Sequence, residues 1–208
     1  MYKIFDLSVA HLAEIADVHM SAFPGRALSD LGSEAVIRYY QWLLDDSHQA
    51  DRFGLIDENK LVGFCFSGKF NGALNGFLKR NQLFLIWKVL SHPRLLFSDF
   101  FRMRIQIALS SLKWVKKSDS VDANSKPKKG SYGILSIAVS SDYQGHGYGY
   151  QLLLHAEKLA LLKKYEWMNL SVDVDNMQAI QFYERNGWKK ITDGVEWLGH
   201  MEKSIGKP

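Results

Sequence analysis

Hydrophobic residues near the start of the chain recur first at strand spacing and then at helical spacing. Residues 2–6 predict a short strand, and a helix is expected from Val9 to about Phe23. Ser8 is a suitable cap for this helix, and the Pro24-Gly25 pair should end it. The apolar face of the helix carries Leu12, Ile15, Ala16 and His19.

The next forty residues predict one more helix and a hairpin. A helix is expected over residues 34–44, with Ser33 as its cap. Two β-branched and aromatic runs, residues 52–56 and 61–66, predict strands, and the polar residues 57–60 between them predict a hairpin turn.

Residues 71–128 differ in character from the rest of the chain. Apolar residues at helical spacing predict two helices over residues 73–115, the second starting at Pro93. The polar segment 116–130, rich in Ser, Asn, Pro and Lys, is expected to be a mobile loop. We interpret 71–128 as an insertion in a single domain that spans residues 1–208.

The last third alternates strands and helices. The expected strands are 134–139, 167–174, 188–192 and 195–203, and the expected helices are 150–164 and 177–186. The whole pattern predicts an α/β fold with a mixed sheet and helices on both faces.

The turn between the strand at 134–139 and the following helix has the composition of an anion site. Gly145, Gly147 and Gly149 stand at alternate positions where the helix begins. Glycine lets the backbone approach a ligand closely, and a helix N-terminus offers unpaired N–H groups and a positive dipole end. A cofactor pyrophosphate fits this chemistry, although a tight turn without a ligand is the plainer alternative.

Two motifs resemble those of the GNAT superfamily of acyl-CoA-dependent N-acyltransferases. The pyrophosphate loop of that family, Gln/Arg-x-x-Gly-x-Gly/Ala, is matched by residues 144–149, and its later Asn-x-x-Ala-x-x-x-Tyr-x-x-x-Gly-Phe pattern is matched by residues 176–188. Ser141 stands where proline is common in the family. The resemblance covers residues 131–192 clearly and does not extend to 71–128. It implies a GNAT-like central splayed sheet flanked by helices.

The resemblance also implies roles for individual residues. The strand residues Ile137, Ala138 and Val139 would lie along acetyl-CoA, whose pyrophosphate the turn would bind. The turn consists of Gln144, Gly145, His146, Gly147, Tyr148, Gly149 and Tyr150. Asn176 would contact the pantetheine arm, although helix capping alone explains an asparagine there. Tyr183 would be the general acid that protonates the departing thiolate, and a core aromatic is its alternative role.

No general base stands out in the sequence. Asp173 and Asp175 follow a strand near the expected acceptor site, and Glu196 and His200 lie on the closing strands. Each is equally compatible with a surface or structural role, and a chain of water molecules could accept the proton instead. No metal site is expected.

Charge is unevenly distributed along the chain. Residues 69–129 contain 13 Lys/Arg and 3 Asp/Glu, whereas the other residues contain 13 and 19, giving the overall +4. Cys65 is the only cysteine, so no intrachain disulfide is possible. The N-terminus lacks the apolar stretch of a signal peptide, and no apolar run is long enough to span a membrane. These features predict a cytoplasmic protein.

Three functions are compatible with these observations. The first is an acetyl-CoA-dependent N-acetyltransferase of a small-molecule amine, such as an amino sugar or its nucleotide conjugate. The second is a protein or peptide N-acetyltransferase, and the third a non-catalytic, membrane-associated acyl-CoA-binding regulator. The basic insertion could cover an anionic acceptor, contact a membrane surface weakly through 73–115, or only cover one end of the sheet. Nucleic acid is not an expected partner, because no nucleic-acid motif accompanies the basic residues.

Overall fold

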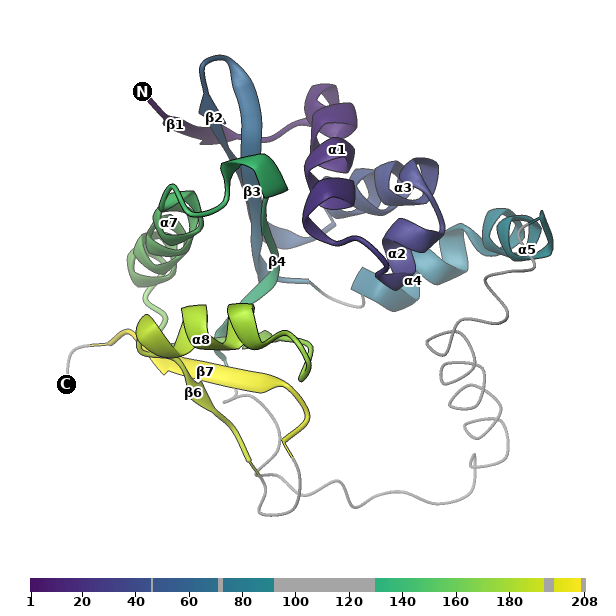
Figure 1. Ribbon diagram of the computed structural model, residues 1–208. Coiled ribbons are helices and arrows are strands. Elements are labelled where there is room, and N and C mark those ends of the chain that lie inside the picture. Colours follow the sequence, from purple (N-terminus) through teal and green to yellow (C-terminus); the bar gives the residue numbers. More distant parts are fainter. Residues whose placement is uncertain (46, 71–72, 92–129, 193–196, 207–208) are drawn as a thin grey trace, which may run out of the picture.

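A seven-stranded mixed sheet forms the centre of the described part of the protein (Figure 1). The computed structural model describes residues 1–45, 47–70, 73–91, 130–192 and 197–206. The strand order is β1-β2-β3-β4-β5-β7-β6, in which only β4 and β5 pair in parallel. The strands are β1 (Lys3–Asp6), β2 (Gln49–Asp57), β3 (Lys60–Lys69), β4 (Tyr132–Val139), β5 (Trp167–Ser171), β6 (Lys189–Lys190) and β7 (His200–Ser204).

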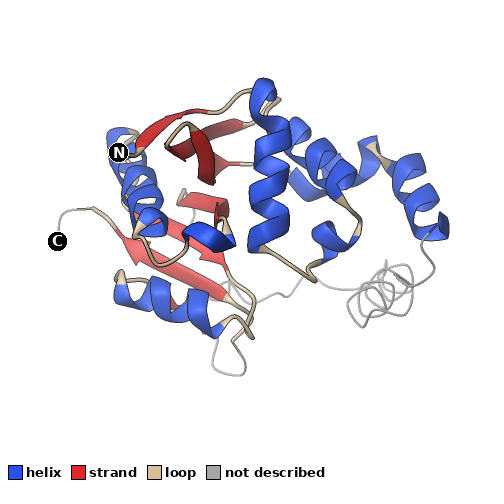
Figure 2. Cartoon of the chain, turned by 45° about the horizontal axis from the view of Figure 1, so that its top comes forward, coloured by secondary structure: helices blue, strands red, loops and turns tan. Residues whose placement is uncertain are grey.

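Helices cover both faces of this sheet, as the hydrophobic pattern predicts (Figures 1 and 2). The helices are η1 (Val9–His11), α1 (Leu12–Ala22), α2 (Ala27–Asp30), α3 (Ser33–Leu43), α4 (Ala73–Arg80), α5 (Gln82–Ser91), η3 (Ser141–Tyr143), α7 (Tyr148–Leu162) and α8 (Met177–Arg185). One core joins α1 and α3 to β3, with Ile15, Tyr40 and Phe64 fully buried. The other joins α7 and α8 to the sheet through Leu152, Leu153, Met168 and Trp188.

The predicted hairpin between β2 and β3 is confirmed. Asp57 pairs with Lys60, and the two residues between them, Glu58 and Asn59, have φ of 47° and 66°. Two consecutive positive φ angles match the twist of a two-residue hairpin turn.

A β-bulge at Leu135 changes which residues of β4 face each core. Ser67 of β3 pairs with Ile134 and Phe66 pairs with Ser136, so Leu135 has no partner on β3. Because side chains alternate along a strand, one extra residue exchanges the two faces. Ile134 before the bulge and Ile137 after it therefore pack on the α7 side, whereas Ala138 packs on the α1 side.

Several predicted boundaries need correction. The strand expected over 188–192 is reduced to β6, Lys189–Lys190, and the strand expected over 195–203 begins at His200. Ser33 is the first residue of α3 and not its cap, which is Gly32 with a φ of 91°. Helix α7 begins at Tyr148, two residues before the expected start, because Gly147 caps it in the left-handed conformation. β5 ends at Ser171 and not at Val174.

The first helix expected in the insertion is two helices. Asn81 separates α4 from α5: its side-chain amide donates to Phe77 O at 3.0 Å, and its own carbonyl accepts from Leu85 N. Asparagine competes for backbone hydrogen bonds in this way, which favours helix ends. The helix expected from Pro93 and most of the loop expected at 116–130 lie outside the described residues. Within the described ranges, no helix is long and apolar enough to cross a bilayer.

Candidate active site

Strand β4 diverges from β5 halfway along its length. Its parallel pairing with β5 covers only Tyr132 to Ile134, whereas its pairing with β3 continues to Val139. Ser140 N donates to Val62 O of β3 at 2.8 Å, so by alternation the N–H groups of Val139 and Ile137 face away from β3, towards the gap. The gap thus contains two backbone donors on the edge of β4. The divergence of β4 from β5 is the splay that the family resemblance implies.

The turn after β4 presents further backbone donors. Gly145 and Gly147 have φ of 82° and 81°, and an added Cβ at either would meet nothing within 4 Å. The first bond along α7 runs from Gln151 N to Gly147 O at 3.1 Å. The N–H groups of Tyr148, Gly149 and Tyr150 therefore have no acceptor within the helix. Three free donors at a positive helix end are the arrangement that favours binding of an anion.

A cavity of about 510 Å³ connects the strand edge, the turn and α8. It contains the following predicted site residues: Ile137, Ala138, Val139, Gln144, Gly145, Gly147, Tyr148, Gly149, Tyr150, Asn176 and Tyr183. The two motifs thus lie at one site although they are about 30 residues apart in the sequence. Residues that the sequence analysis did not name also line it: Ala22, Phe23, Tyr143, Gln178, Ala179, Phe182 and Arg185.

His146 is the one predicted residue that does not line this cavity. Its ring is exposed, and Nδ1 lies 3.1 Å from Gln144 O within the turn itself. Tyr148 lines the cavity, but its hydroxyl donates to Asp57 Oδ2 at 2.6 Å, which ties the start of α7 to the β2–β3 hairpin. The backbone N–H of Tyr148, and not its side chain, is therefore available to an anion.

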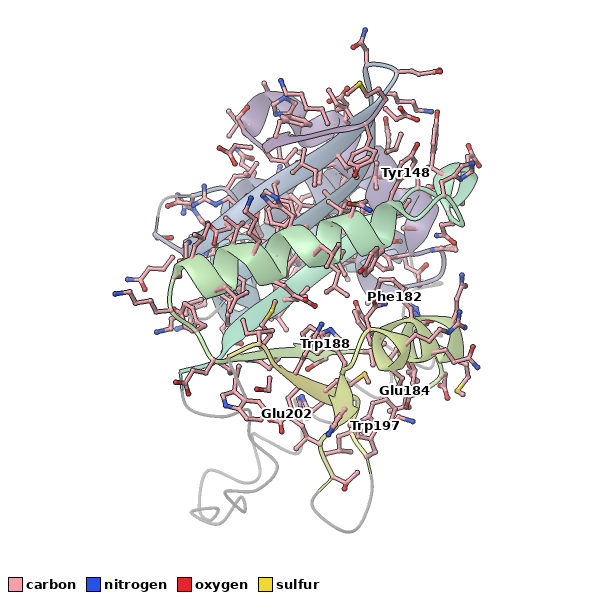
Figure 3. The ribbon with its side chains drawn as sticks, turned by 90° about the vertical axis from the view of Figure 1, so that its left-hand side faces the viewer. Tyr148, Phe182, Glu184, Trp188, Trp197 and Glu202 are labelled. Atoms are coloured by element: carbon pink, nitrogen blue, oxygen red, sulfur yellow. The ribbon has the colours of Figure 1, made fainter. Side chains whose placement is uncertain are left out.

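Helix α8 carries the other predicted residues into the cavity. Asn176 caps α8, with Oδ1 accepting from Ala179 N at 3.1 Å, so the capping role is confirmed and its amide NH2 is left for a ligand. Phe182 lies between α8 and the first turn of α7 (Figure 3), and its ring would be 3.8 Å from a Cβ on Gly149. A Cβ at position 149 would thus make an ordinary van der Waals contact with Phe182.

Tyr183 is a buried residue of the cavity lining. Only 7% of the residue is exposed, and burial raises the pKa of its hydroxyl. Its ring packs against Phe182 and Trp188, so it also has the structural role that was its alternative. Among the described residues, the hydroxyl makes no hydrogen bond. A neutral, unpaired hydroxyl in a cavity can donate a proton or a hydrogen bond to a bound group.

A second cavity, of about 350 Å³, is lined by residues of α1, α3, β4, β5 and α8. The residues it shares with the first are Phe23, Ile137, Asn176, Ala179 and Tyr183. Its walls are mainly apolar and aromatic, from Leu28, Tyr39, Ile134, Leu170 and Val172. Arg26 and Asp173, both part-exposed, form an ion pair in its lining. The two cavities meet beside Tyr183 at the point where β4 leaves β5.

The four general-base candidates from the sequence are placed differently. Asp173 lines the second cavity but is paired with Arg26. Asp175 lines neither cavity, and His200 reaches the second only through Ser171, whose Oγ is 2.9 Å from its Nδ1. Glu196 lies outside the described residues.

The polar residues of the second cavity that sequence reasoning missed include His19, Tyr40 and Ser136. His19 was placed on the apolar face of the first helix, and a titratable residue on such a face was the available signal. Tyr40 and Ser136 gave no signal, because their positions depend on helix packing and on the bulge at Leu135.

The described helices of the basic insertion lie outside both cavities. They pack on α3: Trp42 Nε1 donates to Ala73 O at 2.8 Å, and Lys88 pairs with Glu34 at 3.3 Å. The ring of Phe77 on α4 contacts Tyr39, which lines the second cavity. Figure 1 shows α4 and α5 beyond α3, away from α7 and α8. No group of three potential metal ligands occurs in the described part of the chain.

Comparison with known proteins identifies the family to which the chain belongs. The sequence model of the acetyltransferase (GNAT) family matches residues 12–188, so the chain belongs to that family. The family transfers acetyl groups and uses acetyl-CoA. A comparison with curated proteins finds no match.

Solved structures show the same fold. PH1933 from Pyrococcus horikoshii OT3 is 20% identical with a TM-score of 0.59, and each chain is covered completely. The ribosomal-protein-S18-alanine N-acetyltransferase from Escherichia coli is 16% identical with a TM-score of 0.56, over 100% of this chain and 96% of that one. The PaiA N-acetyltransferase from Thermoplasma acidophilum, solved in complex with coenzyme A, is 17% identical with a TM-score of 0.56, over 98% and 99%.

Proposed function

We propose that this protein transfers the acetyl group of acetyl-CoA to a primary amine of a small molecule. The observation that carries the proposal is the junction of two cavities beside Tyr183. One cavity ends at a turn with free N–H groups, and the other is a small pocket of about 350 Å³ with apolar walls. A small amine, including an amino sugar, fits a pocket of this size better than a folded protein surface does.

Acetyl-CoA binds in the first cavity. The N–H groups of Tyr148, Gly149 and Tyr150 hold its pyrophosphate, and the amide of Asn176 contacts the pantetheine arm. The free N–H groups of Ile137 and Val139 on the β4 edge bind the pantetheine amides and the thioester carbonyl. Backbone donors that point at the developing oxyanion stabilise the tetrahedral intermediate.

The amine approaches from the second cavity. Its nitrogen attacks the thioester carbon, the carbon–sulfur bond breaks, and Tyr183 donates its proton to the departing thiolate. The raised pKa of Tyr183 keeps this proton in place until the thiolate forms. In this scheme 1–208 is one catalytic domain, and the insertion 71–128 supports the acceptor side through α3.

Release of free thiol from acetyl-CoA across a panel of amines tests the proposal. Amino sugars, nucleotide-linked amino sugars, polyamines and peptides with free N-termini form the panel. Release that depends on a small amine supports the proposal. Release only with peptides favours the protein N-acetyltransferase, and acetyl-CoA binding without release for any amine would favour a non-catalytic acyl-CoA-binding protein.

A further inference from the structure

A chain of three polar side chains leads from the second cavity into the core between α1 and α3. Ser136 Oγ of β4 lies 2.9 Å from the hydroxyl of Tyr40, which lies 2.9 Å from Nδ1 of His19. All three residues line the cavity. The two inner residues are buried, with Tyr40 0% and His19 7% exposed, whereas Ser136 is part-exposed.

The bulge at Leu135 creates this arrangement. It turns Ser136 towards α1 and α3, and away from the α7 side that Ile134 faces before the bulge. Ser136 is also next to Ile137, whose free N–H faces the expected thioester. The outer end of the chain is thus one residue from the expected reaction centre.

Burying a polar group in an apolar core costs free energy, so the burial of the His19 ring needs an explanation. His19 packs between the rings of Phe23 and Tyr40, and its Nε2 is buried with no hydrogen-bond partner among the described residues. Burial lowers the pKa of His19 to about 4, so the ring is neutral near pH 7. A neutral ring with its proton on Nε2 has a free lone pair on Nδ1, the atom that faces Tyr40.

We infer that Ser136, Tyr40 and His19 form a relay that accepts the proton lost by the acceptor amine. This inference rests on the proposed function, because the relay is useful only if an amine occupies the second cavity. It supplies the general base that the sequence does not reveal. Ser136 is the member that touches the substrate, and Tyr40 and His19 act through it.

The proton transfer balances as follows. As the carbon–nitrogen bond forms, an N–H proton passes to Ser136 Oγ, the Ser136 proton passes to Tyr40, and the Tyr40 proton passes to His19 Nδ1. The carbon–sulfur bond breaks, and the thiolate takes the proton of Tyr183. After the products leave, the imidazolium of His19 returns its proton along the relay to water in the cavity, and Tyr183 regains one from water.

Three variants interrupt the relay at different points. Tyr40→Phe keeps the ring but removes the hydroxyl, Ser136→Ala removes the outer hydroxyl, and His19→Gln keeps a hydrogen-bond acceptor that cannot hold the proton. Each should lower kcat by about 10²-fold, the lower end of the range for general acid–base catalysis, with acetyl-CoA affinity unchanged. Ser136→Thr, which keeps the hydroxyl, should retain kcat. Ser136→Ala changes a part-exposed position, so it tests the relay even if the Tyr40 variant is poorly folded.

Tyr132→Phe is the matched control. Tyr132 is equally buried, and its hydroxyl lies 2.9 Å from Ser67 Oγ, but it lines neither cavity. It should lose stability without losing kcat. The Tyr40→Phe and Ser136→Ala effects should not multiply in the double variant, because either change alone breaks the relay.

Two outcomes would overturn the relay, and they differ from failure of the proposed function. If the native protein acetylates an amine and folded Tyr40→Phe and Ser136→Ala both keep kcat within about threefold, the relay is wrong and the proposed function stands. Multiplicative effects in the double variant would also contradict a single relay. If the native protein binds acetyl-CoA but acetylates no amine in the panel, the proposed function fails and the relay fails with it.

Discussion

Placing a negative charge at Gly147 is the sharpest test of where the cofactor pyrophosphate binds. Gly147 caps α7 with φ 81° and ψ 0°, and an added Cβ would meet no atom within 4 Å. Asp and Asn tolerate this left-handed conformation better than most residues, at a cost of roughly 1–2 kcal/mol. Gly147→Asp and Gly147→Asn should therefore fold alike, and they differ by one charge at almost constant shape.

The expected difference between the two variants follows from the geometry of the turn. A carboxylate at 147 would lie beside the N–H groups of Tyr148, Gly149 and Tyr150, which we propose hold the phosphate. For two unit charges about 4 Å apart, the repulsion is about 1 kcal/mol in water and about 4 kcal/mol near a protein surface. We expect an intermediate loss of about 2–4 kcal/mol, so Gly147→Asp should bind acetyl-CoA about 30- to 10³-fold more weakly than Gly147→Asn.

Isothermal titration calorimetry of both variants with acetyl-CoA measures this difference. The difference in acetyl-CoA affinity between the two variants should decrease as salt is added, because exposed charges are screened over about 8–10 Å at physiological ionic strength. Equal affinities for the two folded variants would refute a pyrophosphate site at residues 144–150.

Three further predictions follow from the same site. Tyr183→Phe should lower turnover about 10²–10⁴-fold with little change in acetyl-CoA affinity, and turnover within about threefold of native would show that Tyr183 is only structural. His19 has its pKa lowered from 6.5 to about 4, so the unfolded state binds a proton below about pH 6.5 that the native state does not. Its contribution to stability is complete above pH 6.5 and is lost as the pH falls towards 4. When both are unfolded in urea, the free energy of unfolding of native protein should fall by about 2 kcal/mol more than that of His19→Gln between pH 7 and pH 5. An equal fall for the two proteins would contradict a buried neutral ring at His19. Neutralising Lys79, Arg80 and Arg94 should raise the KM for an anionic acceptor and leave the KM for acetyl-CoA unchanged. A raised KM for acetyl-CoA with an unchanged KM for the acceptor would indicate that the basic insertion binds the cofactor.

The turn and the first cavity, which we propose for the cofactor, could be predicted from the sequence because their determinants are local. A β-branched strand, glycines at positive φ and a helix start are adjacent in the chain. Gly145 and Gly147 form the turn as expected, whereas Gly149 lies in the first turn of α7. Tyr183 follows from the motif spacing that starts at Asn176. Similar local patterns predicted the hairpin at 57–60 and most element positions.

The second cavity, which we propose for the acceptor, could not be predicted because it depends on packing between distant segments. His19, Tyr40 and Ser136 come from α1, α3 and β4, and no periodic pattern brings them together. The bulge at Leu135 places the Ser136 side chain on the opposite face of the sheet. A prediction that assumes strict alternation of side chains along the strand does not anticipate this. The break at Asn81 likewise depends on one side-chain hydrogen bond, which helical periodicity does not include.

Transfer of a labelled acetyl group tests the central claim most directly. Native protein and Tyr183→Phe are incubated with acetyl-CoA carrying an isotopic label in the acetyl group and with the amine that best supports thiol release, and the label is followed by mass spectrometry. We predict that native protein moves one labelled acetyl group to the amine nitrogen for each free thiol released, and that Tyr183→Phe does so far more slowly with acetyl-CoA still bound. Thiol release without label on the amine, or equal rates for the two proteins, would contradict amine acetylation at the junction of the two cavities.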